Sequence, residues 1–214
     1  DLFLTIAATT SSNYGKVYNA ISMADFNSPI IQQKTWPLVG RGTGFVDLDN
    51  DTDLDLSVAG GHLNGVSGDN RDFNVLFENT GDGKFIDSSE MSGVLRTGKR
   101  IHRATTFGDY DNDGLQDLYV SNMFSKAGAR ITNRVPGIAE IYKQSAAGNY
   151  LYRQRANHSF ELVSGDNPPA LAIAKAGWSW GGQFDDFDND GFLDLYVLSG
   201  YFTAPGAVSS ELDL

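Results

Sequence analysis

The sequence predicts an all-β protein made of β-propeller-type blades, with about three four-stranded repeats. Three observations lead to this prediction. An Asp-rich loop followed by a strand of alternating apolar residues occurs three times, beginning at Asp47, Asp109 and Asp186. A strand–turn–strand pattern recurs between successive loops, and 24 glycines in 214 residues suit many tight turns. Units of about four short strands are typical of the blades of a β-propeller or a β-solenoid.

Residues 1–36 contain apolar stretches but no Asp-rich loop. We expect N-terminal strands of an incomplete preceding blade in this region. The chain begins with Asp rather than with Met and a basic segment, so its opening does not resemble an intact signal peptide. We therefore expect a processed chain, a fragment of a longer protein, or both.

The first complete unit is expected at residues 37–98. Its Asp-rich loop at 47–55 follows the small-residue stretch GRGTGF and precedes the alternating strand LDLSVAG. The stretch NVLFENTGDGKFIDSSEMSGV then predicts a hairpin, because apolar residues alternate on both sides of a Gly-Asp-Gly turn.

The second unit is expected at residues 99–165 and the third at 166–214, with loops at 109–117 and 186–194. The hairpin of the second unit, NYLYRQRANHSFELVSG, lacks the turn glycines. Residues 123–148 form an insertion, in which IAEIYKQSAA is the best candidate for a helix. Long insertions often carry contacts to partners.

The Asp-rich loops have the ligand types of a calcium site. With the first Asp as position one, carboxylates occur at positions one, three, five and nine. Gly114 and Gly191 stand at position six, where a backbone reversal can turn the carbonyl of position seven inward. Hard oxygen ligands in this number favour Ca²⁺ over Mg²⁺, which retains more of its water.

We expect about three calcium ions. The candidate ligands of the first loop are Asp47, Asp49, Asp51, the Asp53 carbonyl and Asp55, with Thr52 in place of glycine and Asp53 as an additional acid. Those of the second loop are Asp109, Asp111, Asp113, the Leu115 carbonyl and Asp117. Those of the third loop are Asp186, Asp188, Asp190, the Phe192 carbonyl and Asp194. All side-chain ligands of a site come from one short segment, so we expect a structural role for the metal.

Two other interpretations of the loops fit the sequence less well. Asp and Asn favour solvated turns, but three copies with the same spacing favour metal binding. An EF-hand would need a Glu at position twelve and flanking helices, whereas this position is Val58, Val120 and Val197 in strand-like surroundings.

Composition and motifs exclude several classes of function. The formal net charge of −11 disfavours nucleic acid as a partner. Cysteine is absent, so the chain has neither a disulfide framework nor a thiolate site. No apolar run is long enough for a membrane span. The three histidines are scattered, and no hydrolase, zinc-protease or phosphate-loop motif is present.

The stretches FGDYDNDGLQDLYVSN, FDDFDNDGFLDLYVLSG and LFENTGDGKFIDSSEMSGV resemble the FG-GAP/VCBS repeat family, near its bacterial UnbV/ASPIC and cartilage-acidic-protein-like branch. The resemblance covers about residues 38–202. It implies blades like those of the integrin α-subunit propeller, calcium on loops at one face, export, and work in adhesion, scaffolding or carbohydrate association. Three clear blades are fewer than the about seven that we associate with such propellers. We therefore expect further blades of a longer chain, or self-association.

The favoured function is a non-catalytic, calcium-binding module for a protein or carbohydrate ligand, located extracellularly, in the periplasm or at the cell surface. One alternative is a propeller-based polysaccharide-active enzyme that uses the basic stretch with Arg100, His102 and Arg103. The other is a structural subunit of a surface layer or fibre. Trp178 and Trp180 are expected to pack between blades rather than to stack on sugar rings.

Overall fold

The computed structural model describes residues 2–4, 16–18, 25–26, 40–60, 74–81, 84–94, 102–124, 148–165 and 167–200. The named elements in these ranges are β-strands, which confirms the all-β prediction. The helix candidate in the 123–148 insertion lies outside the described residues. No helix in the described part of the chain is long and apolar enough to cross a membrane.

A small antiparallel sheet lies at the N-terminus. It consists of β1 (Leu2–Leu4), β2 (Lys16–Tyr18) and β3 (Asp25–Phe26), in the order β1-β2-β3. These strands fall within residues 1–36, and their assignment to a preceding blade stays a prediction.

Two four-stranded antiparallel sheets follow, and each is a meander of consecutive strands. The first sheet consists of β4 (Gly40–Val46), β5 (Asp55–Gly60), β6 (Asn74–Asn79) and β7 (Phe85–Asp87). The second sheet consists of β8 (Ala104–Gly108), β9 (Asp117–Ser121), β10 (Tyr150–Gln154) and β11 (Phe160–Leu162). Both hairpins inferred from the sequence are therefore present, including the one that lacks turn glycines.

The third sheet differs from the other two in its number of described strands. It consists of β12 (Ser179–Asp185) and β13 (Asp194–Ser199), which pair antiparallel. The sequence predicts four strands for this unit, and residues after Gly200 lie outside the described part. The three sheets fall within the expected blade ranges, whose boundaries remain predictions.

Strand alternation explains how the sheets stack. Leu118 and Val120 of β9 face the first sheet, while Tyr119 between them faces the third sheet. The layer between the first and second sheets contains Leu48, Leu76, Val94, Leu118, Val120, Tyr150, Tyr152 and Phe160. The layer between the second and third sheets contains Tyr119, Leu151 and Phe184, with Leu195 and Val197 packed against them.

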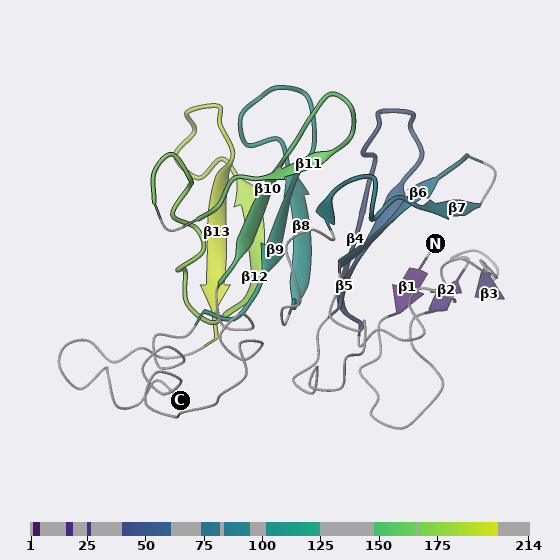
Figure 1. Cartoon of the computed structure of the whole chain (residues 1–214), viewed down its shortest axis with the longest axis horizontal. Coiled ribbons are helices and arrows are strands. Elements are labelled where there is room, and N and C mark those ends of the chain that lie inside the picture. Colours follow the sequence, from purple (N-terminus) through teal and green to yellow (C-terminus); the bar gives the residue numbers. More distant parts are fainter. Residues whose placement is uncertain are drawn as a thin grey trace.

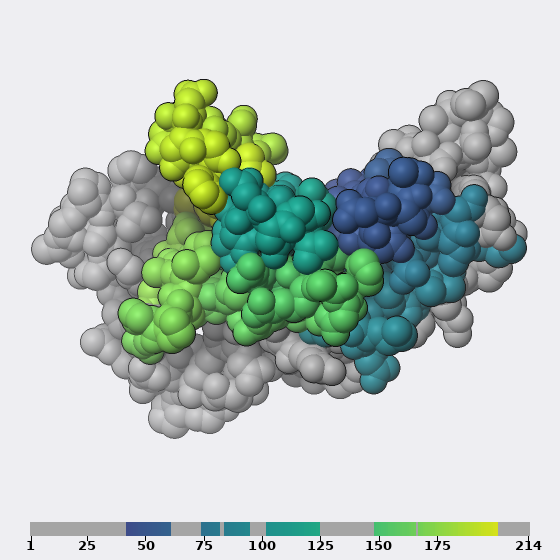
Figure 2. Space-filling view, turned by 90° about the horizontal axis from the view of Figure 1, so that it is seen from above, coloured from purple at the N-terminus to yellow at the C-terminus, as the bar shows by residue number. Residues whose placement is uncertain are grey.

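Glycines of the first strands allow adjacent sheets to approach closely. A Cβ on Gly42 would lie 2.6 Å from the Cα atom of Ala104, and a Cβ on Gly182 would lie 2.6 Å from the ring of Tyr119. The small residues before each Asp-rich loop therefore serve the contact between β4, β8 and β12, which lie side by side in Figure 1. The described residues form a stack of blade-like sheets that does not close into a ring (Figures 1 and 2).

Candidate metal centres

The three Asp-rich loops lie at the same end of the stacked sheets. Each loop joins the first strand of a sheet to its second strand, and in Figure 1 all three lie at the top. The view from above in Figure 2 places these segments next to one another. The fold therefore gathers three acidic loops on one edge of the molecule.

The Asp at position one shapes each loop by accepting two backbone hydrogen bonds. The donors are the N–H groups of positions five and six, at 2.9–3.1 Å. The acceptor–donor sets are Asp47 with Asp51 and Thr52, Asp109 with Asp113 and Gly114, and Asp186 with Asp190 and Gly191. These bonds close the turn and hold the position-one carboxylate at its centre.

The Asp at position nine connects the loop to the strands. Asp55 accepts the N–H of Leu48 at 2.8 Å and the N–H of Asn79, at the end of β6, at 2.8 Å. In the second loop Asp117 accepts the equivalent bonds from Tyr110 at 3.2 Å and from Gln154 at 2.8 Å. Both aspartates are fully buried, so each fixes the loop, the second strand and the third strand together.

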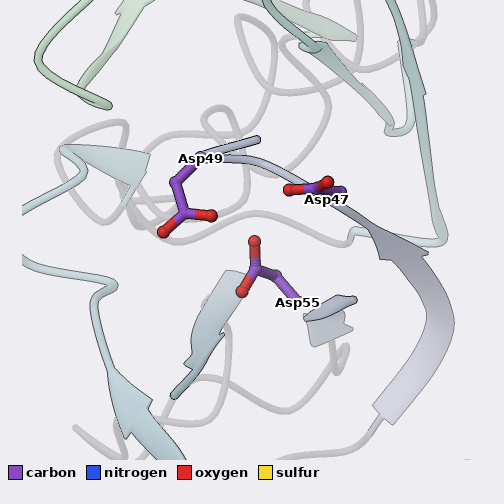
Figure 3. Close-up of side chains that lie close together, drawn as sticks. All are labelled: Asp47, Asp49 and Asp55. Carbon is purple, nitrogen blue, oxygen red and sulfur yellow. The ribbon is translucent and has the colours of Figure 1, made fainter. Parts of the chain in front are cut away.

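Positions one, three and nine converge on one point in every loop. One carboxylate oxygen from each of the three residues lies within 4.8 Å of the others. The three sets are Asp47, Asp49 and Asp55; Asp109, Asp111 and Asp117; and Asp186, Asp188 and Asp194. In Figure 3 the carboxylates of the first set point toward one another.

The acids at position five do not belong to these convergent sets. The side chains of Asp51, Asp113 and Asp190 instead accept the N–H of position seven at 2.8–3.1 Å. Asp53 lies apart from the first set as well, although its carbonyl remains a candidate ligand. The carbonyls of Asp53, Leu115 and Phe192 stay predicted ligands.

Burial makes the convergent carboxylates costly without a cation. Desolvation raises the pKa of Asp55 to about 6, although the hydrogen bonds from Asn79 and Leu48 oppose the shift. Desolvation likewise raises the pKa of Asp117 to about 6. Among the described residues, Asp111 Oδ1 is buried and accepts no hydrogen bond. A hard cation would relieve each of these penalties, so the residues present fit Ca²⁺.

The loop backbone adopts left-handed conformations at two positions. Position six has φ values of 79° at Thr52, 85° at Gly114 and 89° at Gly191. Position four also lies in this region, with φ values of 58–62° at Asn50, Asn112 and Asn189. Asn tolerates this conformation better than other non-glycine residues, so Asn at position four is a further signal of these loops in the sequence.

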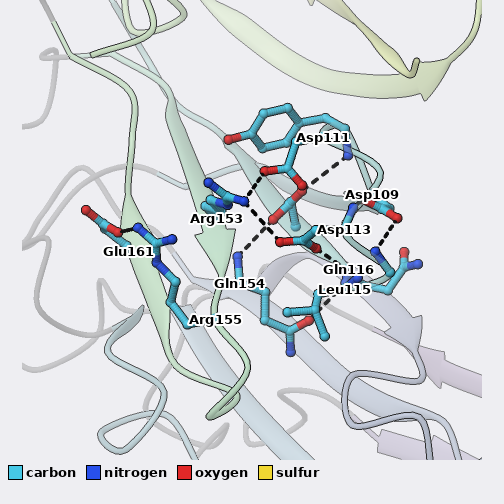
Figure 4. Close-up of polar contacts among 12 residues, drawn as sticks. Asp109, Asp111, Asp113, Leu115, Gln116, Arg153, Gln154, Arg155 and Glu161 are labelled. Atoms are coloured by element: carbon cyan, nitrogen blue, oxygen red, sulfur yellow. Dashed lines mark hydrogen bonds and ion pairs between the residues drawn. The ribbon is translucent and has the colours of Figure 1, made fainter. Parts of the chain in front are cut away.

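The third strand places a different charge beside each of the first two loops. Arg153 of β10 contacts Asp111 at 2.7 Å and Asp113 at 3.2 Å, and Figure 4 shows its guanidinium directed at both. In the second sheet, Arg153 directly precedes Gln154, whose N–H donates to Asp117. In the first sheet, Glu78 directly precedes Asn79, whose N–H donates to Asp55. The first loop therefore faces an acid where the second loop faces a base.

Two further contacts join neighbouring loops, and no local sequence pattern indicates them. The fully buried Gln154 side chain donates to the Leu48 carbonyl of the first loop at 2.8 Å. The same side chain accepts the N–H of Gln116, just after the second loop's turn, at 2.9 Å. Asn112 of the second loop donates to the Gly191 carbonyl of the third loop at 2.8 Å.

A cavity of about 180 Å³ opens beside the first loop. Its wall includes Asp49 and Asp55 of the convergent set, together with Glu78, Met91 and His158. Two candidate metal ligands therefore border a space that solvent can enter.

The basic stretch considered for an enzyme does not form an open groove in the described residues. His102 and Arg103 are only 1% and 8% exposed, and Arg100 lies outside the described part. The Arg103 guanidinium lies 3.7 Å from the ring centre of Trp180 and 5.7 Å from that of Trp178. Trp180 is half-exposed and stacks on this cation instead of entering an apolar layer.

Comparison with known proteins agrees with this architecture. The model of the FG-GAP-like repeat matches residues 47–120 and 137–197. Cartilage acidic protein 1 of Homo sapiens is 26% identical over 163 residues, which covers 59% of this chain and 24% of that protein. The Mus musculus protein of the same name is 26% identical over 163 residues, which covers 59% of this chain and 25% of that protein. The chain thus spans about a quarter of the length of these relatives.

The family match includes the first two loops, the hairpin of each four-stranded sheet and the third loop up to Val197. It extends over more than half of the chain. The chain therefore belongs to the FG-GAP-like repeat family.

Proposed function

We propose that this chain is an exported, calcium-stabilised repeat module that binds a protein or carbohydrate and performs no catalysis. The observation that carries the proposal is the same three-carboxylate arrangement in all three loops. Chance placement of exposed acids would not repeat the hydrogen bonds at positions one and nine from loop to loop.

The proposed role of the ion follows from the bonds of position nine. Asp55 and Asp117 each contact the loop, begin the second strand and accept from the third strand. A cation at this point neutralises the carboxylates and tightens three segments at once. At free calcium of about ten times the dissociation constant, each site adds about 1.4 kcal/mol to stability.

Export is proposed because weak structural calcium sites suit millimolar calcium outside cells. The family membership and the similarity to proteins named for cartilage support this location. The absence of cysteine leaves metal binding and strand packing as the sources of rigidity.

Calcium counting tests the proposal directly. Native mass spectrometry and isothermal titration calorimetry should find three ions at millimolar calcium, and chelation should lower the melting temperature. Asp109→Asn and Asp186→Asn should each remove one ion. Asp185→Asn is the matched control, because Asp185 precedes the third loop and lies outside its convergent set. A wild-type chain without bound calcium would refute the metal role.

The binding role is tested separately from the metal role. An array of matrix proteins and acidic polysaccharides, probed with the calcium-loaded chain, should give calcium-dependent binding without cleavage. The burial of His102 and Arg103 supports the absence of catalysis. Release of new reducing ends from a polysaccharide would favour the enzyme alternative instead.

A further inference from the structure

We propose that the cavity beside the first loop binds the guanidinium group of an arginine on a partner protein. The second repeat contains the same arrangement within the chain, because its own Arg153 contacts the corresponding acids of the second loop. The first repeat has an acid in place of this arginine, and a cavity lies beside it. This inference adds a partner site to the module proposed above, and it does not depend on a bound metal.

Arg153 shows how a guanidinium fits against an Asp-rich loop of this fold. It contacts Asp111, at position three, at 2.7 Å and Asp113, at position five, at 3.2 Å (Figure 4). The arginine stands on β10, the third strand of its sheet. A guanidinium suits this place because it pairs strongly with carboxylates and can bridge two of them.

The first repeat places an acid at the corresponding point. Asp49 stands at position three of the first loop and Asp51 at position five. Glu78 takes the place that Arg153 has in the second sheet. Asp49 and Glu78 lie close enough to Asp55 for their charges to repel it. The third strand therefore supplies a positive charge to the second loop and a negative charge to the first.

The cavity combines negative charge with an apolar wall. It measures about 180 Å³, far more than the roughly 15 Å³ that a single water molecule needs. Asp49, Asp55 and Glu78 line it together with Leu48 and Leu76. An arginine packs its methylene stem along apolar surface while its charged head pairs with acids. One arginine side chain therefore suits both parts of the wall.

Hydroxyl oxygens at the wall favour a guanidinium over the ammonium of lysine. The hydroxyls of Ser88 and Ser92 line the cavity. They donate their hydrogens to the carbonyls of Leu76 and Ser89, at 3.2 and 3.1 Å. Their oxygen lone pairs can therefore accept further hydrogen bonds. A guanidinium has five N–H donors in fixed directions and gains more from such spread acceptors than an ammonium with three.

The mouth of the cavity indicates that the arginine belongs to a protein. Met91 lines the cavity and is 85% exposed. Exposed methionines are common at protein-binding surfaces, because their flexible side chains adapt to a partner. His158 of the turn between β10 and β11 also lines the cavity, so its wall comes from both the first and the second sheets. A bound partner would therefore contact both sheets.

Peptide titration of the full chain in chelator tests this site. The probe is the peptide acetyl-Gly-Gly-Arg-Gly-Gly-amide, and the control peptide carries citrulline, which has nearly the same shape without the charge. We expect the arginine peptide to bind on the order of tenfold more tightly, because only its hydrogen bonds are charge-assisted. Chemical shifts in two-dimensional NMR spectra measure both affinities and should change at Leu48, Leu76 and Met91. Equal affinities for the two peptides would overturn the proposal.

Substitutions at residue 78 locate the bound arginine. Glu78→Gln should weaken binding of the arginine peptide roughly threefold or more. Glu78→Arg places an arginine where the second repeat has one and should abolish binding, with the chain still folded by circular dichroism. Glu90→Gln is the matched control, because Glu90 is exposed in the same turn as Met91 and is not among the residues that line the cavity. Equal losses in Glu78→Gln and Glu90→Gln would indicate general attraction to an acidic surface and would overturn the site.

Calcium separates this inference from the proposed metal role. An ion at the first loop and the arginine both approach Asp49 and Asp55, so each should weaken the binding of the other by the same factor. Equal or tighter peptide binding by a calcium-loaded first loop would place the peptide elsewhere and overturn the proposal. A chain that binds the arginine peptide but no calcium would refute the metal role and support the arginine site.

Discussion

At the scale of single residues, Asp55 and Asp117 determine how the loops respond to pH. Each is a carboxylate that is buried yet accepts two backbone hydrogen bonds. Desolvation outweighs these bonds and raises both pKa values to about 6. Without a cation, the folded state therefore binds protons at these groups more tightly than the unfolded state does.

The metal-free chain should be more stable at pH 5 than at pH 7.5. A carboxyl group with a raised pKa in the folded state contributes stability that is complete below its unfolded pKa of 3.8 and lost as the pH rises through about 6. A tenfold difference in proton affinity between the folded and unfolded states corresponds to about 1.4 kcal/mol. Thermal unfolding in chelator, followed by circular dichroism across this range, measures the effect.

Saturating calcium should reverse this dependence. The ion favours the charged carboxylates, so protons compete with it and stability should fall on acidification. The Asp55→Asn and Asp117→Asn double variant is the control and should lose most of the pH dependence in chelator. An unchanged melting temperature between pH 5 and pH 7.5 in chelator would contradict the assignment of the raised pKa values to these groups.

Arg153 and Glu78 should give the second and first loops different calcium affinities. The Arg153 guanidinium contacts Asp111 of the convergent set and the neighbouring Asp113, and it therefore competes with a cation. Glu78 adds negative charge near Asp55. We expect Arg153→Gln to strengthen calcium binding at the second loop roughly threefold or more at low salt, and Glu78→Gln to weaken binding at the first loop.

Calorimetric calcium titration measures both changes, with one loop observed at a time. Asp186→Asn together with Asp47→Asn isolates the second loop, and Asp186→Asn together with Asp109→Asn isolates the first. High salt should reduce both effects, because Arg153 is partly exposed. Shifts of the same sign for the two charge removals would rule out the electrostatic explanation.

At the scale of elements, position six decides how easily each loop folds. Thr52 has a φ of 79°, a left-handed conformation that suits glycine and strains a β-branched residue. Gly114 has a φ of 85°, and a Cβ there would meet no atom within 4 Å. The two positions therefore differ in backbone strain. A side chain added at Gly114 would not clash with its surroundings, so a loss of stability there would report backbone strain alone.

Exchanging these residues should change stability in opposite directions. Thr52→Gly should stabilise the first loop, and Gly114→Thr should destabilise the second loop, each by about 1 kcal/mol. Urea unfolding in chelator and in calcium measures the free energies. A loss of stability from both substitutions would show that the Thr52 side chain makes a contact more favourable than the relief of strain.

Local sequence patterns predicted the strand after each loop and the two hairpins, but not the first strand of each sheet. The Asp spacing located all three loops, and alternation located β5, β9 and β13 directly after them. Alternation also identified the β10–β11 hairpin, although its turn lacks glycine. These features depend on residues that are near one another in the chain, where turn chemistry and side-chain alternation act.

The remaining features of the site depend on residues far apart in the chain. Arg153 follows Asp113 by 40 residues, and Gln154 follows Leu48 by 106 residues. No local pattern indicates which charge a third strand brings to a loop. Asp113 bonds the loop backbone and Arg153, and its place among the calcium ligands stays a prediction.

At the scale of the whole molecule, the loops form a connected series along one edge. Gln154 bonds the Leu48 carbonyl of the first loop and the Gln116 N–H of the second loop. Asn112 connects the second loop to the third through the Gly191 carbonyl. Each pair of neighbouring loops is thereby joined by hydrogen bonds, and the Gln154 side chain that makes two of them is buried.

The Gln154→Leu variant should weaken the contact between the first and second sheets. Leu has no amide and leaves the buried Leu48 carbonyl and the partly buried Gln116 N–H without their partner. Unsatisfied buried groups of this kind cost about 1–3 kcal/mol each, so we expect a loss of about 2–5 kcal/mol in the free energy of unfolding.

Gln183→Leu is the matched control, because Gln183 is exposed on β12 and its replacement should change stability by less than about 0.5 kcal/mol. Urea unfolding gives both values, and hydrogen exchange should show faster exchange at the first loop in Gln154→Leu alone. Equal effects of the two substitutions would mean that the buried amide does not join the sheets.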